Sequence, residues 1–259
     1  MKITRKDFLR LTGLSFLAAG TIEATHAIAG RSAAQESAPR KETPSQTVRW
    51  GMVVDLRKCR KDNGCDACIQ ACNSAHNIPQ FSNPKHQVKW IWTQPYETVF
   101  PFIQNGYAEQ TDAGIQVPLM CNHCADPPCV RVCPTQATWK RADGIVMMDW
   151  HRCIGCRYCM AACPYGSRSF NWLDPRPHIP HINPDFPTRT KGVVEKCNFC
   201  EERLAQGQRP ACVDACPEKA LVFGNLADPN SEPRQLLRER FAVQREPELG
   251  TGPSVYYLV

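Results

Sequence analysis

An α+β fold, built from short strands and short helices around bound cofactors, is what this sequence predicts. Sixteen cysteines among 259 residues are far more than an ordinary cytosolic enzyme carries, so they indicate disulfides, metal sites or both. Short extended runs stand beside the cysteines, and 22 prolines with 15 glycines indicate long irregular connections. Such a chain suits a small fold that cofactors hold together better than a regular bundle or barrel.

The N-terminus has the pattern of a signal peptide, which we place at residues 1–29. A basic start is followed by an apolar stretch over residues 11–22 and then by small residues. The start resembles a twin-arginine (Tat) export signal at Arg5, with Lys6 where a second arginine is usual. The alternative, an ordinary amphipathic helix, is disfavoured because glycines interrupt the apolar stretch.

The remaining chain is expected to consist of a linker, residues 30–47, and one main domain, residues 48–259. No segment of this domain approaches the ~18 uninterrupted apolar residues that a membrane span requires. We therefore expect it to meet a membrane only through partners. The net charge of +6 is spread along the chain, which favours a solvated basic surface and argues against nucleic acid as a partner.

Four motifs, at residues 59–72, 121–133, 153–163 and 197–216, use all sixteen cysteines. The third motif, followed by Pro164, matches the bacterial ferredoxin run C-x2-C-x2-C-x3-C-P. In that run three thiolates wrap one [4Fe-4S] cluster, and the fourth belongs to another cluster. We therefore expect motifs to exchange ligands, with the first three cysteines on a loop and the fourth entering a short helix.

The residues around the motifs vary in two ways. Pro134, Pro164 and Pro217 follow the last cysteines of motifs two to four, where each is expected to stop a helix, whereas motif one has Asn73. Motif one also has five residues between its first two cysteines, and the end of this insertion, residues 62–64, is expected to form a tight turn.

Other uses of the cysteines fit the spacing less well. Four close-packed sets with trailing prolines are not a disulfide framework, although an exported protein permits disulfides. Three thiols within seven residues are awkward for one tetrahedral zinc, which leaves zinc as the next-best alternative. Haem c is excluded for these motifs because no C-x2-C pair is followed by His.

Extended runs are expected before motifs one, two and three, at residues 50–56, 116–120 and 145–149, and after motif four, at residues 221–223. Residues 137–141 and 145–149 flank Ala-Asp-Gly and are expected to form a hairpin. This alternation predicts two interleaved ferredoxin-like halves, one made by motifs two and three and the other by motifs one and four. Residues 73–120 and 164–192 are interpreted as long irregular insertions that cover clusters or form partner surfaces.

Several side chains outside the motifs are also singled out. Trp90 and Trp92 stand at strand period, which favours core packing over a partner-binding edge. The histidines next to the motifs, His76 and His123, are interpreted as cluster-shell or surface residues. The basic neighbours Arg157 and Lys196 are interpreted as groups that raise a cluster's potential or are simply solvated.

With these residues in hand, the chain resembles the four-cluster ferredoxin subunits of membrane-associated oxidoreductases, which include the iron-sulfur subunits of dimethyl-sulfoxide, polysulfide, tetrathionate and nitrite reductase systems. The resemblance extends over residues 50–259. It rests on C-N-H-C-A-D-P-P-C-V-R-V-C-P from Cys121, D-G-I-V-M-M-D from Asp143, K-C-N-F-C from Lys196 and P-A-C-V-D-A-C-P from Pro210. The stretched first motif and K-W-I-W from Lys89 look most like the DsrO type, the periplasmic iron-sulfur subunit of sulfite-reduction-associated Dsr complexes.

The resemblance implies four [4Fe-4S] clusters, with iron as the metal and cysteine as every ligand. We name the implied sites by letters: site a holds Cys59, Cys65, Cys68 and Cys216; site b holds Cys197, Cys200, Cys212 and Cys72; site c holds Cys121, Cys124, Cys129 and Cys163; site d holds Cys153, Cys156, Cys159 and Cys133.

The implied function is a periplasmic relay of single electrons, peripheral to the inner membrane, in a sulfur-metabolism-type complex. The implied partners are an NrfD-like multi-span quinone-interacting protein and a multihaem cytochrome c. The alternative is the electron-transfer subunit of a molybdopterin-dependent reductase, or of a nitrite reductase or hydrogenase system. No catalytic site is expected, because the chain has no P-loop, no G-x-G-x-x-G, no G-x-S-x-G and no H-E-x-x-H.

Overall fold

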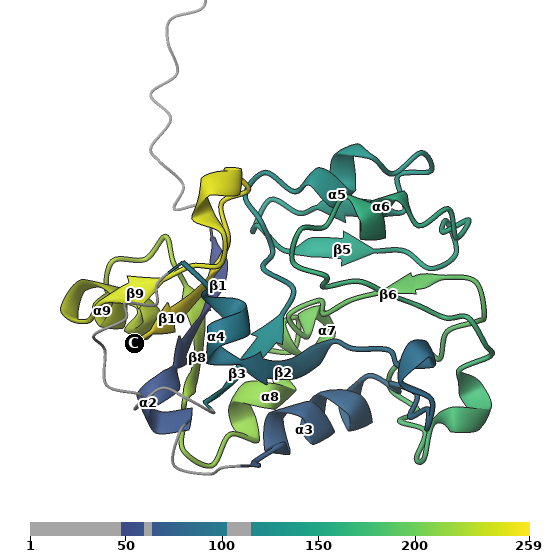
Figure 1. The fold of residues 1–259 in the computed structure, drawn as a ribbon, viewed down its shortest axis with the longest axis horizontal. Coiled ribbons are helices and arrows are strands. Elements are labelled where there is room, and N and C mark those ends of the chain that lie inside the picture. The colour runs from purple at the N-terminus through teal and green to yellow at the C-terminus, as the bar shows by residue number, and fades with distance from the viewer. Residues whose placement is uncertain (1–47, 60–63, 103–114) are drawn as a thin grey trace, which may run out of the picture. The chain divides into compact units, whose positions relative to one another are not determined.

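The largest sheet of this computed structural model joins the two ends of the described chain (Figure 1). Strand β1 (Trp50–Asp55) pairs in antiparallel fashion with β8 (Leu221–Asn225) and in parallel with β10 (Val255–Leu258). Strand β9 (Ala242–Val243) extends the other edge of β10. Helix α9 (Glu232–Glu239) packs against β8 and β1. The C-terminal segment therefore completes the sheet that begins just before motif one.

The structure describes residues 48–59, 64–102 and 115–259, all within the unit that extends from Pro44 to Val259. The expected signal peptide and linker, and the expected turn before Gly64, lie outside the described residues. None of the helices in these three ranges has the length and the hydrophobicity that are needed to cross a bilayer. The described chain mixes short helices with short strands, as expected for an α+β fold.

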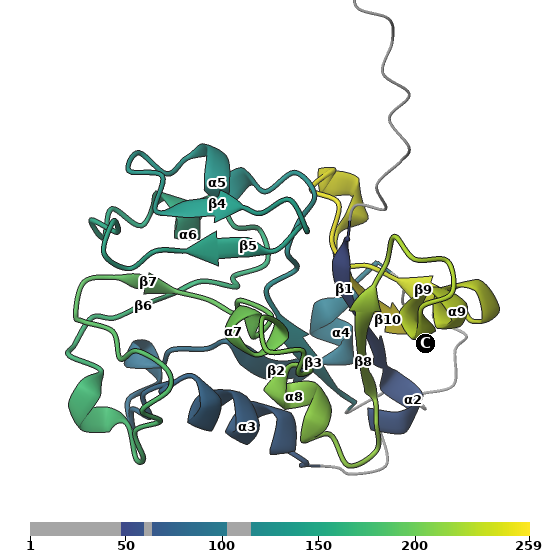
Figure 2. The same cartoon turned by 180° about the vertical axis from the view of Figure 1, so that it is seen from behind.

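The described residues also form three two-stranded sheets (Figure 2). Strand β2 (Ile91–Pro95) pairs with β3 (Gln116–Met120), β4 (Thr138–Lys140) with β5 (Val146–Met148), and β6 (Ser169–Phe170) with β7 (Val194–Glu195). The β4–β5 pair is the predicted hairpin. Its turn closes with a hydrogen bond from Gly144 N–H to Arg141 O, and Gly144 has a φ of +86°, which glycine adopts without strain.

The helices next to the motifs are short and pack in two pairs. Helix α3 (Ala67–Ala75) of motif one packs against α8 (Ala211–Asp214) of motif four, and α5 (Pro128–Arg131) of motif two packs against α6 (Tyr158–Ala161) of motif three. The remaining helices are α2 (Leu56–Cys59), α4 (Tyr96–Val99) and α7 (Glu201–Leu204), and single 3-10 turns lie at Pro84–His86, Arg176–His178 and Pro247–Leu249.

The structure corrects the expected position of the cysteines on these helices. The third cysteine of each motif lies within the helix, and the fourth follows the helix in motifs two, three and four. Prolines explain the difference, because the residue before a proline avoids the helical conformation. In motif one, where Asn73 replaces the proline, α3 continues to Ala75 and contains Cys72 as well as Cys68.

The described part of residues 73–120, which was interpreted as an irregular insertion, also contributes to the main core. Trp90 is 1% exposed and belongs to the main core, together with residues of β2 and β3. Trp92 packs against the same core, so the prediction of core packing for both tryptophans is confirmed.

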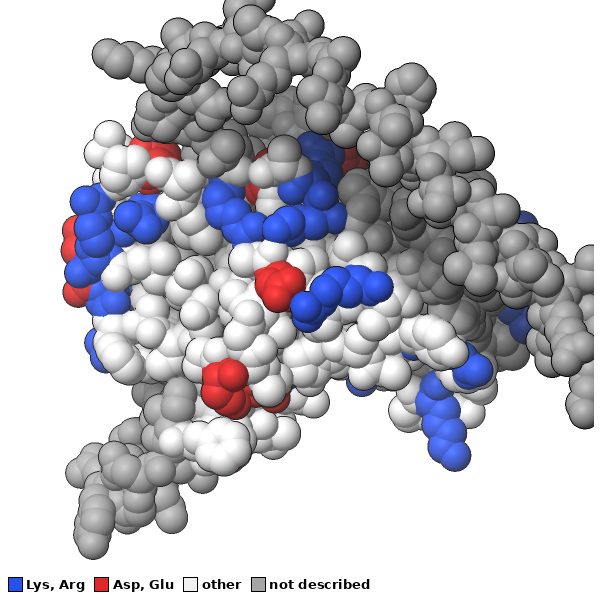
Figure 3. Space-filling model, turned by 90° about the horizontal axis from the view of Figure 1, so that it is seen from above, with Lys and Arg blue, Asp and Glu red and all other residues white. Residues whose placement is uncertain are grey.

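On the face shown in Figure 3, Lys and Arg side chains lie in separate groups with Asp and Glu near them, consistent with charge that is spread along the sequence.

Candidate iron-sulfur sites

Site a is a cavity lined by cysteines that are far apart in the sequence, namely Cys59, Cys65, Cys68 and Cys216. Helix α2 ends at Cys59, and Cys216 follows α8, so the packing of α8 against α3 brings motif four to motif one here. The other walls are mainly apolar and include Ile115 and Leu221.

The thiols of site a oppose one another's ionisation. Burial, the nearby thiols of Cys216 and Cys65 and the carboxylate of Asp55 together raise the pKa of Cys59 to about 11. Burial and the nearby thiols of Cys59, Cys216 and Cys65 together raise the pKa of Cys68 to about 12. Four thiolates therefore require a positive metal centre among them to remain charged at neutral pH.

Site b lies where α3 meets the loop and helix of motif four. Cys72 is buried on α3, and burial together with the neighbouring thiols of Cys197, Cys212 and Cys200 raises its pKa well above the usual value. Burial and the thiols of Cys200 and Cys197 do the same for Cys212. The fourth cysteine of motif one is thus surrounded by the first three of motif four.

Site c brings together the first three cysteines of motif two and the last of motif three. Burial raises the pKa of Cys124 to about 12, with contributions from the thiols of Cys121, Cys129 and Cys163. Burial, with Cys121 and Cys129 as thiol neighbours, also raises the pKa of Cys163.

Site d lies beside site c. Cys159 shares a small core with Cys129, and Cys133 and Cys153 pack against that core. Cys156 is half-buried in the same loop, three residues before Cys159. Burial disfavours the thiolate of Cys133, but hydrogen bonds from the backbone N–H of Thr138 and from Thr135 hold its pKa below the usual value.

The chemistry of these donors fits iron-sulfur clusters. All sixteen cysteines are free thiols. In motif four, backbone N–H groups donate to sulfur: Phe199 to Cys197 Sγ at 3.4 Å, Ala211 to Cys200 Sγ at 3.3 Å and Ala220 to Cys216 Sγ at 3.2 Å. Such bonds are made to cluster ligands and stabilise negative sulfur.

Comparison with protein-family models supports the same chemistry. A model described as a 4Fe-4S dicluster domain matches residues 113–176 and 179–226, which contain motifs two, three and four. The Hdr-like menaquinol oxidoreductase iron-sulfur subunit 1 of Archaeoglobus fulgidus is 41% identical over 98% of this chain and 97% of its own length. The chain belongs to the family of iron-sulfur electron-transfer subunits of reductase complexes.

Two other members of this family are similar over most of the chain. An iron-sulfur protein of Halobacterium salinarum that is named for dimethyl sulfoxide reductase is 41% identical over 82% of this chain and 79% of its own length. The menaquinone reductase iron-sulfur cluster-binding subunit of Nitratidesulfovibrio vulgaris is 38% identical over 82% of this chain and 89% of its own length.

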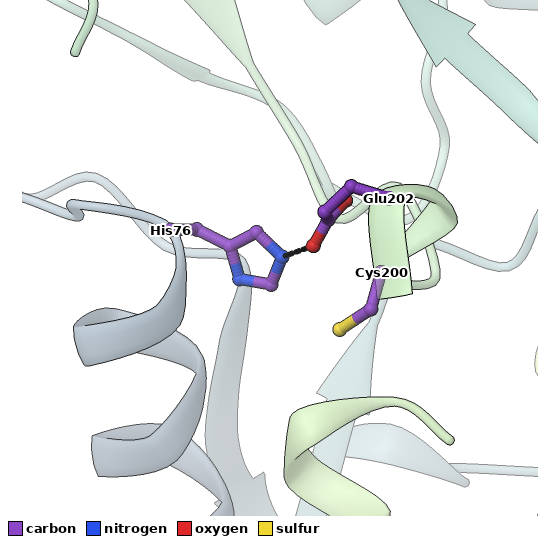
Figure 4. A group of neighbouring side chains, drawn as sticks. All are labelled: His76, Cys200 and Glu202. Carbon is purple, nitrogen blue, oxygen red and sulfur yellow. Dashed lines mark hydrogen bonds and ion pairs between the residues drawn. The ribbon is translucent and has the colours of Figure 1, made fainter. Parts of the chain in front are cut away.

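His76, next to site b, is buried and so is not a surface residue. Figure 4 shows its ring directed toward Glu202. Its Nε2 lies 2.9 Å from Glu202 Oε1, and its Nδ1 lies 3.0 Å from the carbonyl oxygen of Cys72. Ligand atoms of His76, Glu202 and Cys200 all lie within 4.8 Å of one another, which is a spacing that a metal ion also permits. Because both ring nitrogens lie within hydrogen-bond distance of oxygen atoms, we interpret His76 as a support that fixes α3 against motif four.

His123 is also buried, and it links motif two to motif four. Its ring stacks on Phe199, and its Nδ1 accepts a hydrogen bond from Val146 N–H at 3.0 Å. Burial lowers the pKa of His123 well below the usual value, and the nearby cations Lys196, Arg49 and Arg168 lower it further. The ring is therefore neutral at pH 7.

The two basic neighbours of the motifs differ from each other in burial. Arg157 is exposed and lies over the rings of Phe170 and Trp172. Lys196 is 1% exposed and donates to the carbonyl oxygens of Val146 and Cys197.

Three buried or half-buried residues near the sites escaped sequence reasoning: Glu202, Phe199 and Arg168. No sequence motif distinguishes these residues from ordinary charged surface residues or ordinary core residues.

Proposed function

We propose that this chain relays single electrons through four [4Fe-4S] clusters between a quinone-interacting membrane subunit and other redox subunits of a sulfur-metabolism-type complex. The observation that carries the proposal is the grouping of the thiols. At sites a, b and c, three cysteines of one motif lie near one cysteine of another, which supports the exchange that ferredoxin runs make.

The ligands in this proposal are the sets defined above as sites a, b, c and d, so that motif one exchanges with motif four and motif two with motif three. The chain would then consist of two interleaved ferredoxin-like halves. The packing of α3 on α8 and of α5 on α6 supports this arrangement. Support is strongest at site a, where all four thiols line one cavity, whereas at site d it rests on the packing of Cys133 and Cys153 around the core that contains Cys159.

Each bound cluster would accept one electron and pass it on without substrate chemistry. The protein's part is to hold the thiolates, to exclude water and to fix the charges nearby. Apolar walls, such as Ile115 at site a, cover part of the cysteine side chains, and backbone N–H groups stabilise the thiolates in motif four. These factors set cluster potentials.

We further propose that the chain is exported as a folded protein and works at the periplasmic side of the inner membrane, as in the DsrO type. The reason is physical, because clusters are assembled in the reducing cytosol and an unfolded, threaded chain would leave them behind. An NrfD-like membrane protein and a multihaem cytochrome c are the proposed partners. The relatives named for menaquinol oxidoreductase and menaquinone reductase favour a quinone-linked complex.

A second candidate function is electron delivery to a molybdopterin-dependent reductase. The relative named for dimethyl sulfoxide reductase favours it, since that chain is as identical to this one as the menaquinol oxidoreductase subunit is. Both candidates use the same cysteines and the same clusters.

Two measurements test the proposal. Anaerobically purified protein should contain about sixteen iron and sixteen acid-labile sulfide per chain, because four cubanes require both. An iron content near twelve per chain would mean that one of the four sites holds no complete cluster. Zinc in place of iron would refute the proposed electron transfer. The subunits that copurify from native membranes then distinguish the two candidate functions. A quinone-interacting membrane protein together with cytochromes supports the first, and a large molybdenum-containing subunit supports the second.

A further inference from the structure

Arg168 is a buried cation that lies between motifs two and three. Only 5% of its surface is exposed. Its Nη2 donates to Cys129 Sγ at 3.0 Å and to Thr138 Oγ1 at 2.9 Å, and its Nη1 lies 3.7 Å from Met148 Sδ. A charged group at this depth is costly unless an opposite charge compensates it.

The compensating charge is not a carboxylate in the part of the chain that the structure describes. The hydrogen-bond partners of Arg168 there are the thiols of Cys129 and Cys159, a hydroxyl and a thioether. Arg189, which is equally buried, has the usual arrangement, because its Nη2 lies 2.7 Å from the carboxylate of Glu195. Arg168 therefore lacks the partner that a purely structural arginine has.

The negative charges that face Arg168 belong to proposed cluster ligands. Burial opposes the charge of the guanidinium, but the thiolates of Cys129, Cys159 and Cys121 hold its pKa above the usual value. Two of these cysteines belong to site c and one to site d. Site a differs, because the charges that act on Cys59 come from other thiols and from Asp55, all of them negative.

We propose that Arg168 is the counter-ion of sites c and d, where it raises the reduction potential of the cluster held by Cys121, Cys124, Cys129 and Cys163 and, to a smaller extent, that of its neighbour at site d. This inference rests on the proposed function, since it requires clusters at both sites. The physical reason is that reduction adds one negative charge, and a fixed cation in direct contact with a ligand sulfur favours the more negative state. No proton is needed, because an arginine stays charged through the whole pH range of the protein.

The test is a redox titration of the cluster-loaded protein, followed by EPR, for the wild type, Arg168→Met and Arg168→Lys. We expect Arg168→Met to make reduction at site c at least tenfold less favourable, which is about 59 mV for one electron. A smaller shift in the same direction is expected at site d and none at site a. Arg168→Lys keeps the charge and should stay close to the wild type.

Arg152→Met is the matched control, because it removes the same charge next to Cys153 from a side chain that is 64% exposed. Water screens that charge, so we expect little change in potential. Equal shifts at all four sites, or no shift at site c in Arg168→Met, would overturn the inference. Loss of iron from Arg168→Met alone supports it, whereas loss from both Arg168 variants contradicts a role based on charge.

The outcome is separable from that of the proposed function. If wild-type protein lacks about sixteen iron, the four-cluster relay fails before Arg168 is tested. If the wild type is fully loaded and Arg168→Met leaves the potentials unchanged, only the counter-ion inference fails.

Discussion

His123 and Phe199 stack with their ring centroids 3.7 Å apart, and each stands between the first two cysteines of a different motif. Phe199 is 1% exposed, and His123 is completely buried. The stack thus joins the loop of motif two directly to the loop of motif four, so that the packing of one proposed site depends on the other.

Removing this stack should destabilise the whole domain. Phe199→Ala deletes a buried ring, which costs about 3–5 kcal/mol and should lower the midpoint of thermal unfolding by roughly 6–20 °C. The measurement is loss of cluster absorbance and of circular dichroism on heating. Phe241→Ala is the control, because that ring is 71% exposed and its removal should change stability by no more than about 0.5 kcal/mol. Equal effects of the two substitutions would contradict the structural role of the stack.

Ligand exchange between motifs predicts which cluster each fourth cysteine serves. Cys163→Ser should perturb the cluster of site c and leave that of site d nearly unchanged, and Cys133→Ser should do the reverse. Potentiometric EPR on both variants detects the difference. If Cys163→Ser instead damages the cluster nearest Cys153, each motif wraps its own cluster and the interleaved halves must be abandoned.

The pair of Asp55 and Arg240 predicts a pH-dependent contribution to stability. Asp55 is 3% exposed at the end of β1, and its carboxylate accepts hydrogen bonds from Nη1 and Nη2 of Arg240. Burial disfavours the charge of Asp55, but Arg240 and two backbone N–H groups hold its pKa below the usual value. Arg240→Ala leaves this acceptor without its cation and should cost about 1–3 kcal/mol at pH 7.

The sign follows from the direction of the pKa shift. Because the pKa of Asp55 is lower in the folded than in the unfolded state, its charge stabilises the fold at any pH above the unfolded-state pKa, about 3.9. This stabilisation is lost as the pH falls through the folded-state pKa. The stability difference between wild type and Arg240→Ala should therefore shrink below about pH 4. Unfolding midpoints from pH 7 to pH 3 measure it, with exposed Arg234→Ala as the control. A difference that stays constant over this range would contradict the electrostatic explanation.

Replacement of Arg5 and Lys6 by Gln tests export. Because these residues stand where a twin-arginine signal has its basic pair, we expect cluster-loaded protein to accumulate in the cytoplasm. Fractionation and iron analysis of both compartments measure it, in a strain without other subunits that have a signal of their own. Continued delivery to the periplasm would refute the proposed route.

Local sequence chemistry was a good guide to the short elements. The strand at residues 116–120 was predicted with its observed bounds. The hairpin around Gly144 was predicted from the Ala-Asp-Gly turn sequence, and in the structure this glycine has a positive φ. The placement of the cysteines on their helices was wrong, since the ferredoxin run fixes spacing and not where a four-residue helix begins.

The sequence by itself determined the donor set, because the spacing of sixteen cysteines is a local property that only a few cofactors fit. Tertiary structure alone decided what surrounds those donors. Whether a lysine or arginine is solvated or buried depends on contacts across the chain, so that Lys196 lies inside while Arg157 lies on the surface. The charge of Arg168 faces thiols and not a carboxylate for the same reason, since Cys129 and Thr138 reach it only when motif two folds against motif three.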